Sequence, residues 1–186
     1  IGDVLFGAVN PGGKLTMTFP KSVGQIPLYY AHKNTGRPLK EGKWFEKFRS
    51  NYLDVDNDAL YPFGYGLSYT TFRFSDITLN RSSIGMDNEL VASVTVTNTG
   101  DRAGSEVVQL YIRDLVGSVT RPVKELKGFE KIYLQPNESR TVRFTIAPEM
   151  LKFYNADLKF VAEPGDFDVM IGPDSRNVKT ARFTLR

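Results

Sequence analysis

The side chains best suited to chemistry in this sequence lie between residues 29 and 44. His32 is the single histidine among 186 residues, and Arg37 and Trp44 follow it closely. A histidine, an arginine and an aromatic ring together suit a polyhydroxylated ligand, because the ring offers a stacking face and the polar groups offer hydrogen bonds. His32, Arg37 and Trp44 are therefore candidate ligand-contacting residues. For His32, a hydrogen bond inside a packed segment is the alternative.

Residues near the start of the chain partly match the motif of a phosphate-binding loop. Gly7 and the pair Gly13-Lys14 supply glycines and a lysine, but the second glycine stands one position too far along. Leu15 occupies the position where a hydroxyl would hold Mg²⁺. These residues therefore predict a turn and no nucleotide site.

The acidic run Asp54 to Asp58 resembles the opening of a calcium-binding loop. Ala59 stands where such a loop requires glycine, and Tyr65 stands where it requires a bidentate glutamate. A solvated acidic turn is the prediction, and a weak cation site is the alternative.

The remaining acidic residues do not mark a catalytic pair. Glu106, Glu138 and Asp174 fall at turns or at outward strand positions, so we expect them to be solvated. The chain has no cysteine, which excludes disulfide scaffolds, thiolate metal sites and thiol catalysis. A single histidine leaves almost no room for a Ser-His-Asp or multi-histidine metal site. We therefore assign no catalytic residue, metal or cofactor to this chain.

The charge balance narrows the range of partners. Lys and Arg total 24 and Asp and Glu total 21, giving a formal net charge of +3. The basic residues do not gather into the one-sided stripe typical of nucleic-acid binders. No apolar run approaches the roughly 18 residues of a membrane span. We therefore expect neither nucleic acid nor a membrane as partner.

Residues 71–186 must supply the rigid frame, because they repeat a rhythm of strands and turns. Inward positions alternate with polar ones, as in Leu90, Ala92, Val94 and Val96. About seven short strands over roughly 115 residues are typical of a two-sheet antiparallel β-sandwich. Pro148 to Lys152 predict one helical turn. The predicted strands are 72–79, 89–98, 106–114, 124–133, 139–147, 166–172 and 180–185.

Residues 29–70 form an irregular and aromatic arm. The stretch from 29 to 74 holds 12 of the 23 aromatic residues and shows no sustained period. Irregular segments are normally polar and exposed, so rings in this number require a covering body. Residues 1–28 predict a helix end capped by Gly7, a turn and a strand at 15–19, which cannot bury a core of their own. We therefore expect this chain to be the C-terminal piece of something longer.

Several motifs resemble the C-terminal region of glycoside hydrolase family 3 β-glucosidases. The first are Asn10 to Leu15, Phe19-Pro20 and Tyr61 to Thr70. Val108 to Tyr111, Arg121-Pro122 and Leu126 to Lys131 are similar to the fibronectin type III-like domain of that family. Tyr29-Tyr30 and Gly36 to Pro38 are similar to its periplasmic bacterial branch.

The resemblance implies an all-β, immunoglobulin or fibronectin type III-like antiparallel sandwich at 71–186. It also implies the end of an α/β sandwich domain at 1–28, with 29–70 as the connecting arm. The implied enzyme is retaining and exo-acting, hydrolyses terminal β-D-glucosyl residues, and takes its Asp nucleophile and Glu acid/base from upstream domains. His32, Arg37 and Trp44 become candidate substrate-binding residues at the active-site rim. A homodimer contact and a periplasmic or secreted location are further expectations.

A free-standing carbohydrate-binding or adhesion module is the alternative hypothesis. Such a module would use exposed rings of residues 29–70 as a stacking platform. Its arm would stay ordered in isolation, whereas a severed arm would expose a large apolar patch.

Overall fold

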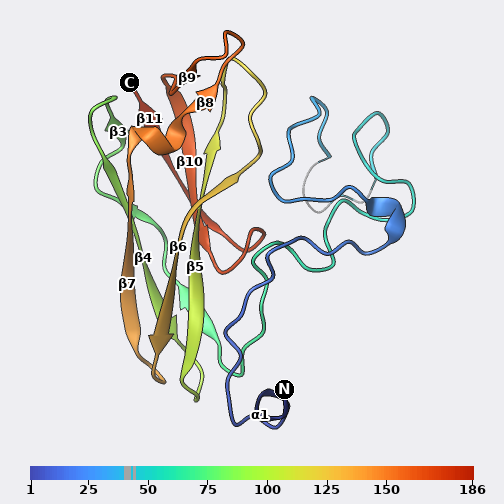
Figure 1. The fold of residues 1–186 in the computed structure, drawn as a ribbon, viewed down its shortest axis with the longest axis vertical. Coiled ribbons are helices and arrows are strands. Elements are labelled where there is room, and N and C mark those ends of the chain that lie inside the picture. Colours follow the sequence, from blue (N-terminus) through green and yellow to red (C-terminus); the bar gives the residue numbers. More distant parts are fainter. Residues whose placement is uncertain (40–42, 44) are drawn as a thin grey trace.

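The molecule consists of a β-sandwich with a long irregular segment lying along one side (Figure 1). The computed structural model describes residues 1–39, 43 and 45–186. The described residues contain three short helices: α1 (Gly2–Leu5), η1 (Val23–Gln25) and η2 (Pro148–Leu151). The strands are β1 (Phe72–Phe74), β2 (Thr78–Leu79), β3 (Ser83–Ile84), β4 (Leu90–Asn98), β5 (Gly104–Asp114), β6 (Glu125–Leu134), β7 (Ser139–Ile146), β8 (Phe153–Tyr154), β9 (Phe160–Val161), β10 (Gly165–Gly172) and β11 (Lys179–Leu185).

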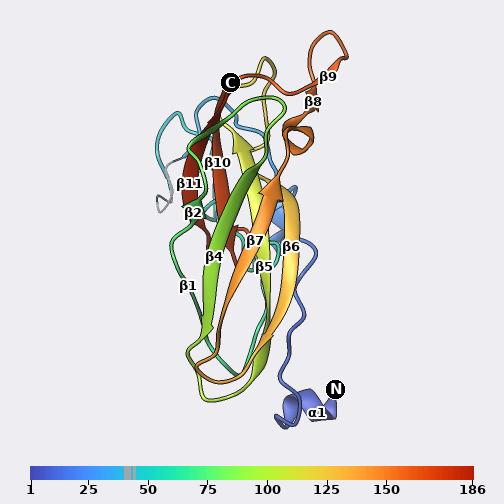
Figure 2. The same cartoon turned by 90° about the vertical axis from the view of Figure 1, so that its left-hand side faces the viewer.

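Two sheets face each other across the core (Figure 2). In one, β4 pairs with β7 on one edge and with β1 and β2 on the other. The second has the strand order β3-β11-β10-β5-β6. Every pairing in these two sheets is antiparallel except that of β3 with β11. The predicted all-β sandwich is therefore confirmed.

Alternation of side chains along the strands builds the core. Leu90, Ala92, Val94 and Val96 of β4 are each at most 1% exposed, while the residues between them are half-buried. Strand side chains alternate between the two faces of a sheet, so this period of two places one face inward. Val108, Leu110 and Ile112 of β5 and Val169 and Ile171 of β10 close the core from the opposite sheet.

Six of the seven predicted strands form with bounds that shift by at most two residues, and the seventh is interrupted. The predicted strand at 72–79 divides into β1 and β2 because the Ser75 hydroxyl accepts the N–H of Thr95 at 2.9 Å. A side chain thereby takes the place that a backbone carbonyl would hold in the ladder. The helical turn at Pro148 is confirmed as η2, with proline in its first turn.

The N-terminal segment, residues 1–28, only partly matches expectation. α1 ends before Gly7, whose φ of 76° is the left-handed conformation typical of a helix C-cap. The predicted strand at 15–19 is wrong, since only an isolated bridge joins Phe19 to Tyr61. The Leu15 N–H donates to the Tyr65 carbonyl and the Leu15 carbonyl accepts the Gly64 N–H, both at 2.8 Å. Met17, which lies between Leu15 and Phe19 in the sequence, is exposed. Apolar and polar residues alternate along 15–19, but no neighbouring strand pairs with this stretch among the described residues.

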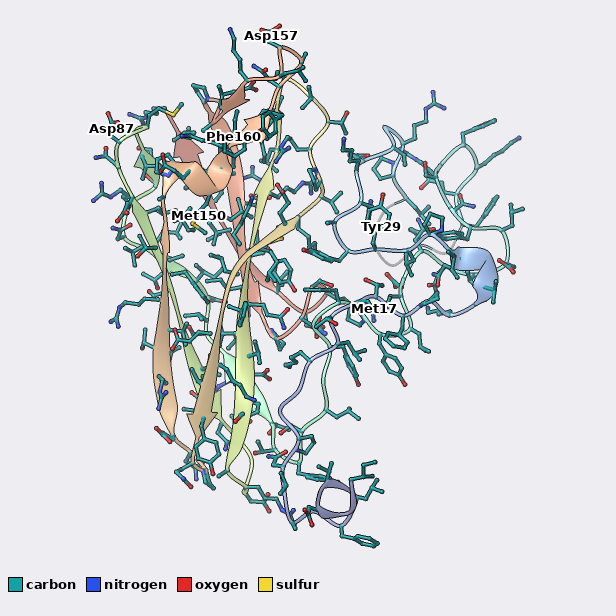
Figure 3. The ribbon with its side chains drawn as sticks, viewed as in Figure 1. Met17, Tyr29, Asp87, Met150, Asp157 and Phe160 are labelled. Atoms are coloured by element: carbon teal, nitrogen blue, oxygen red, sulfur yellow. The ribbon has the colours of Figure 1, made fainter. Side chains whose placement is uncertain are left out.

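A short hairpin of β8 and β9 stands at one end of the sandwich and was not predicted. The Asn155 side chain accepts the N–H groups of Asp157 and Lys159, each at 3.0 Å, and so closes the turn. Figure 3 shows Asp157 and Phe160 at this end, away from Tyr29 on the arm and Met17 on the N-terminal segment. Two-residue strands are too short for periodicity to indicate them.

The arm, residues 29–70, lies on the outer side of the five-stranded sheet. In Figure 1 it occupies the side opposite β4 and β7, and in Figure 2 it lies behind the sandwich. β5 is thus covered on both faces, by the core on one and by the arm on the other. This arrangement explains why five consecutive residues of β5, Val108–Ile112, are all buried.

Candidate functional site

His32 lies where the arm runs beside the loop between β5 and β6. Its backbone carbonyl accepts the N–H of Val123 at 2.9 Å, and Nδ1 of its ring lies 3.2 Å from the Lys33 carbonyl. The residue is exposed. The backbone hydrogen bond therefore fixes the position of the His32 main chain, while its side chain is accessible to a ligand.

Arg37 lines a shallow hollow of about 250 Å³ formed by the arm alone. Its other lining residues are Glu46, Lys47, Phe48 and Arg49. His32 does not line this hollow, so the structure does not bring the two candidates into one pocket. Trp44 lies outside the described residues.

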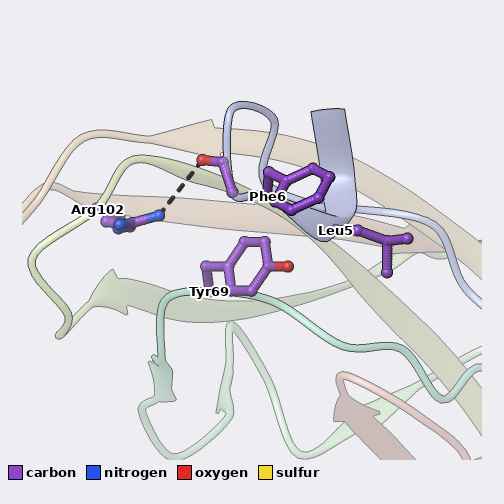
Figure 4. Close-up of a pocket in the computed structure, with 5 residues that line it drawn as sticks. Leu5, Phe6, Tyr69 and Arg102 are labelled. Atoms are coloured by element: carbon purple, nitrogen blue, oxygen red, sulfur yellow. Dashed lines mark hydrogen bonds between the residues drawn. The ribbon is translucent and has the colours of Figure 1, made fainter. Parts of the chain in front are cut away.

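A second hollow, of about 470 Å³, lies beside α1 at the far end of the arm (Figure 4). Leu5, Phe6, Gly7, Tyr69 and Arg102 line it. The Arg102 guanidinium lies 5.8 Å from the centre of the Tyr69 ring and donates to the Gly7 carbonyl at 3.4 Å. The lining carries no carboxylate, and Phe6 is 91% exposed. The hollow is therefore open and mixed in character, and the residues that line it offer no carboxylate for acid or nucleophilic catalysis.

Polar residues on the outer face of β5 bind the arm at a contact that we call the seam. The seam comprises Gln109 and Tyr111 of β5 with Tyr30, Phe63 and Gly64 of the arm. Gln109 Nε2 donates to the Gly64 carbonyl at 3.2 Å, and the Tyr111 hydroxyl donates to Gln109 Oε1 at 2.5 Å. Burial raises the pKa of the Tyr111 phenol above its usual range, so this donor keeps its proton.

Aromatic rings complete the seam. Tyr30 stacks on Phe63 at 4.3 Å between ring centres and meets Tyr111 edge-on at 5.7 Å. The sequence pattern did not predict this role for Gln109 and Tyr111. The available signal was a polar and an aromatic residue at outward positions within the apolar stretch Val107–Ile112.

Glu106 corrects the expectation that the acidic residues are solvated. It is 7% exposed, and Lys14 lies 2.6 Å from its carboxylate. The lysine of the near phosphate-binding motif thus neutralises a buried carboxylate of β5. The ion pair joins the N-terminal segment to the sandwich.

Asp174 is a second correction. It is 4% exposed and accepts the N–H groups of Arg176 and Asn177 at 2.8 Å each. It therefore organises the turn between β10 and β11, whose Ser175 N–H bonds the Phe63 carbonyl at 2.9 Å. Glu138 is partly exposed, at the turn between β6 and β7.

The acidic run at 54–58 lies in a turn held by Lys21. Lys21 Nζ contacts both carboxylate oxygens of Asp56, at 2.6 and 2.7 Å. This hydrogen bond lowers the pKa of Asp56 below its ordinary value of 3.8. Buried Gln25 joins the same two stretches by donating to the carbonyls of Asp56 and Asp58.

Replacing Lys21 with methionine is expected to raise the pKa of Asp56 toward 3.8. A lowered folded-state pKa contributes stability above the unfolded value and loses it as the pH falls through the folded value. The wild type should lose this contribution as the pH falls below 3.8 and through the folded pKa, and the variant should lack the part that Lys21 supplies. Carboxyl carbon NMR titration measures the pKa. Lys152→Met, which breaks a distant pair with Glu149, is the control, and an unchanged Asp56 in Lys21→Met would contradict the assignment.

Arg121 and Asp114 form a buried cluster behind the arm. Arg121 Nη2 contacts Glu125 at 2.8 Å, and its guanidinium carbon lies 4.2 Å from the centre of the Phe153 ring. Arg121 Nε lies 3.7 Å from Asp114 Oδ2, and neither atom has a hydrogen-bond partner among the described residues. Burial raises the pKa of the Asp114 carboxyl. Any stability that Asp114 contributes is therefore lost as the pH rises through its folded pKa.

Within the described part of the chain, no group of three or more acidic or histidine side chains is placed to hold a metal ion. Among the same residues, no helix is both long enough and apolar enough to cross a bilayer.

Comparisons with known proteins match the chain in two blocks. Residues 1–69 match the glycosyl hydrolase family 3 C-terminal domain, and residues 106–175 match the fibronectin type III-like domain. The periplasmic β-glucosidase of Salmonella typhimurium is 56% identical over 185 residues, which are 100% of this chain and 24% of that protein. A putative β-xylosidase of Formosa agariphila is 47% identical over 98% of this chain and 23% of its own length.

A solved structure repeats the fold along nearly the whole chain. The β-glucosidase of Listeria innocua in complex with glucose aligns with a TM-score of 0.93 and 44% identity, covering 98% of this chain and 25% of that one. The chain thus spans about a quarter of the length of the relatives that it matches.

Proposed function

Because the chain belongs to glycoside hydrolase family 3, with that family's C-terminal domain followed by a fibronectin type III-like domain, we propose that it is the C-terminal part of a β-glucosidase. The enzyme is retaining and exo-acting, and it removes terminal β-D-glucosyl residues from oligosaccharides or glycosides. Retention requires two carboxyl groups about 5–5.5 Å apart. The preceding domains supply that pair, and the present chain scaffolds them.

Exposed apolar surface on the first 70 residues is the observation that carries this proposal. Among the described residues, 16 of the 23 exposed large hydrophobic side chains precede residue 71. Exposed apolar side chains concentrated in one part of a protein mark a surface that contacts a partner. The preceding catalytic domains are the partner that covers it. The most exposed members are Ile1, Leu5, Phe6, Val23, Phe48, Leu53 and Leu67.

The three segments have different roles in this proposal. Residues 1–28 are the C-terminal end of an α/β sandwich domain. Residues 29–70 form the connecting arm, and residues 71–186 form the fibronectin type III-like domain. The Lys14–Glu106 ion pair and the seam support a fixed placement of the first two segments on the third.

His32, Arg37 and Trp44 remain proposed contacts of the substrate at the active-site rim. The exposed ring of His32 and the hollow beside Arg37 support a role for the first two. A homodimer contact is also part of the proposal. A periplasmic or secreted location is supported by the relative named as periplasmic.

The isolated chain is expected to release no nitrophenol from an aryl β-glucoside, because the acid and the nucleophile are elsewhere. A chimera in which this chain replaces the matching 185 residues of the Salmonella relative should be active. The measurement is initial rate on nitrophenyl β-glucoside, with the β-xyloside as the specificity control.

Three results would contradict the proposal in different ways. Turnover by the isolated chain that survives repurification would place the chemistry within it. An inactive but folded chimera would remove the scaffold role. Saturable oligosaccharide binding by the isolated chain, without binding of a dye for apolar surfaces, would favour a free-standing carbohydrate-binding module.

A further inference from the structure

Arg121 sends its side chain back into the sandwich from the loop between β5 and β6. Three elements meet its guanidinium: Glu125 of β6 at 2.8 Å, Phe153 of β8 at 4.2 Å from the ring centre, and Asp114 of β5 at 3.7 Å. Gly117 covers the aliphatic part, since a Cβ added there would lie 2.9 Å from Arg121 Cγ. The side chain is 14% exposed.

The residues that follow Arg121 contact the arm directly. Pro122 forms an isolated antiparallel bridge with Lys33, and Val123 donates its N–H to the His32 carbonyl at 2.9 Å. The N–H of Leu126 lies 3.4 Å from the Tyr30 hydroxyl. Residues 122–126 therefore run along arm residues 30–33, beginning one position after the buried arginine.

We propose that Arg121 is a positioning residue that fixes arm residues 30–33, and with them His32, against the sandwich. His32 makes its described ring hydrogen bond only to its neighbour Lys33, so its location depends on the backbone bond to Val123. That bond in turn depends on where the loop lies, and Arg121 holds the loop. The consequence for substrate rests on the proposed function, because His32 is a rim residue only within the whole enzyme.

Arginine suits this position better than any other residue. Its planar guanidinium can stack on Phe153 while its separate N–H groups face Glu125 and Asp114. Lysine keeps the charge but has a compact ammonium group, so it cannot stack on the ring while it donates to Glu125 and faces Asp114. Methionine keeps the length but removes the cation beside Asp114, and it leaves Glu125 with Lys127 Nζ alone, at 3.6 Å.

The test uses the full 186-residue chain and its single histidine, whose ring gives one set of NMR signals. In Arg121→Met we expect shifted His32 ring signals and exchange of the Val123 amide hydrogen at least about tenfold faster. Arg121→Lys should restore part of both effects. Arg182→Met, which breaks the Arg182–Asp168 pair on the surface of the same sheet, is the matched control and should change neither.

Core amides of β4 and β10 report whether each variant remains folded. A folded Arg121→Met with unchanged His32 signals and unchanged Val123 exchange overturns the proposal. Should Arg121→Met not fold, Gly117→Ala takes its place, because the added methyl presses on the arginine and keeps its charge. Unchanged His32 signals in a folded Gly117→Ala would then overturn the proposal.

Activity separates this proposal from the broader one. In the chimera, Arg121→Met should raise KM for the aryl glucoside more than it lowers kcat, since His32 would shift without loss of the acid or the nucleophile. An inactive wild-type chimera refutes the proposed function but leaves the NMR result to decide the role of Arg121. If the chimera is active but Arg121→Met leaves its KM unchanged, the link from Arg121 to substrate is refuted.

Discussion

Replacing Gly64 with alanine is expected to detach the arm from the sandwich. Gly64 has a φ of 80°, and a Cβ at that position would overlap the side-chain amide of Gln109. The left-handed conformation costs an L-residue about 1–2 kcal/mol, and overpacking adds about 1–3 kcal/mol. Displacing Gln109 also disturbs its bonds to Gly64, Pro173 and Tyr111.

Hydrogen exchange of the backbone amides at the seam measures this effect. The N–H of Gly64 bonds the Leu15 carbonyl and the N–H of Ser175 bonds the Phe63 carbonyl, so the Ser175 amide in the variant, and neighbouring arm amides, should lose protection by roughly a hundredfold or more. Gly36→Ala is the matched control: its φ is 85°, but no atom lies within 4 Å of the added carbon. It should lose only the part due to backbone strain, and equal losses in the two variants would refute overlap with Gln109 as the cause.

Replacing Phe167 with alanine is expected to cost about 3–5 kcal/mol of the free energy of unfolding. Phe167 is 1% exposed and stacks on Phe183 at 5.4 Å between ring centres, in the middle of the core. Domains of this size have about 5–15 kcal/mol in total, so the variant should be close to unfolding. Urea denaturation followed by circular dichroism measures the loss.

Phe129→Ala in the same sheet is the control for that experiment. Phe129 lies on edge strand β6 and is 68% exposed, so its removal should change the free energy of unfolding by less than about 0.5 kcal/mol. A comparable loss in both variants would mean that Phe129 packs in solution against something that the structure does not place there.

The two experiments address different layers of the molecule. Phe167 tests the sandwich, whose core is buried between its own two sheets. Gly64 tests the seam, where an irregular segment is held by a few polar groups, one stacked ring pair and one edge-on ring contact. A loss of the seam with an intact sandwich would explain how one domain can hold, or release, the stretch that carries His32.

The sequence alone was sufficient to predict the sandwich, since each strand carries its own evidence. In β4, Leu90, Ala92, Val94 and Val96 alternate with Val91, Ser93, Thr95 and Thr97, so the purely apolar face is the one that is buried. Gly7 and Pro148 were equally local signals, because a left-handed C-cap and a helix start depend on the chain next to them. The arm is rich in aromatic residues but shows no helical or strand periodicity. This combination predicted apolar surface that the chain does not bury by itself, and several arm rings are indeed exposed.

Only the tertiary structure decided which polar residues are buried and which apolar ones are not. Glu106 and Asp174 carry the local signature of solvated residues, yet Lys14 pairs with the first and backbone N–H groups satisfy the second. Gln109 is buried by Gly64, which stands 45 residues earlier in the sequence. Met17 shows a strand's alternation but has no sheet beside it. Burial depends on which distant segment lies opposite a side chain, and a local pattern carries no information about that segment.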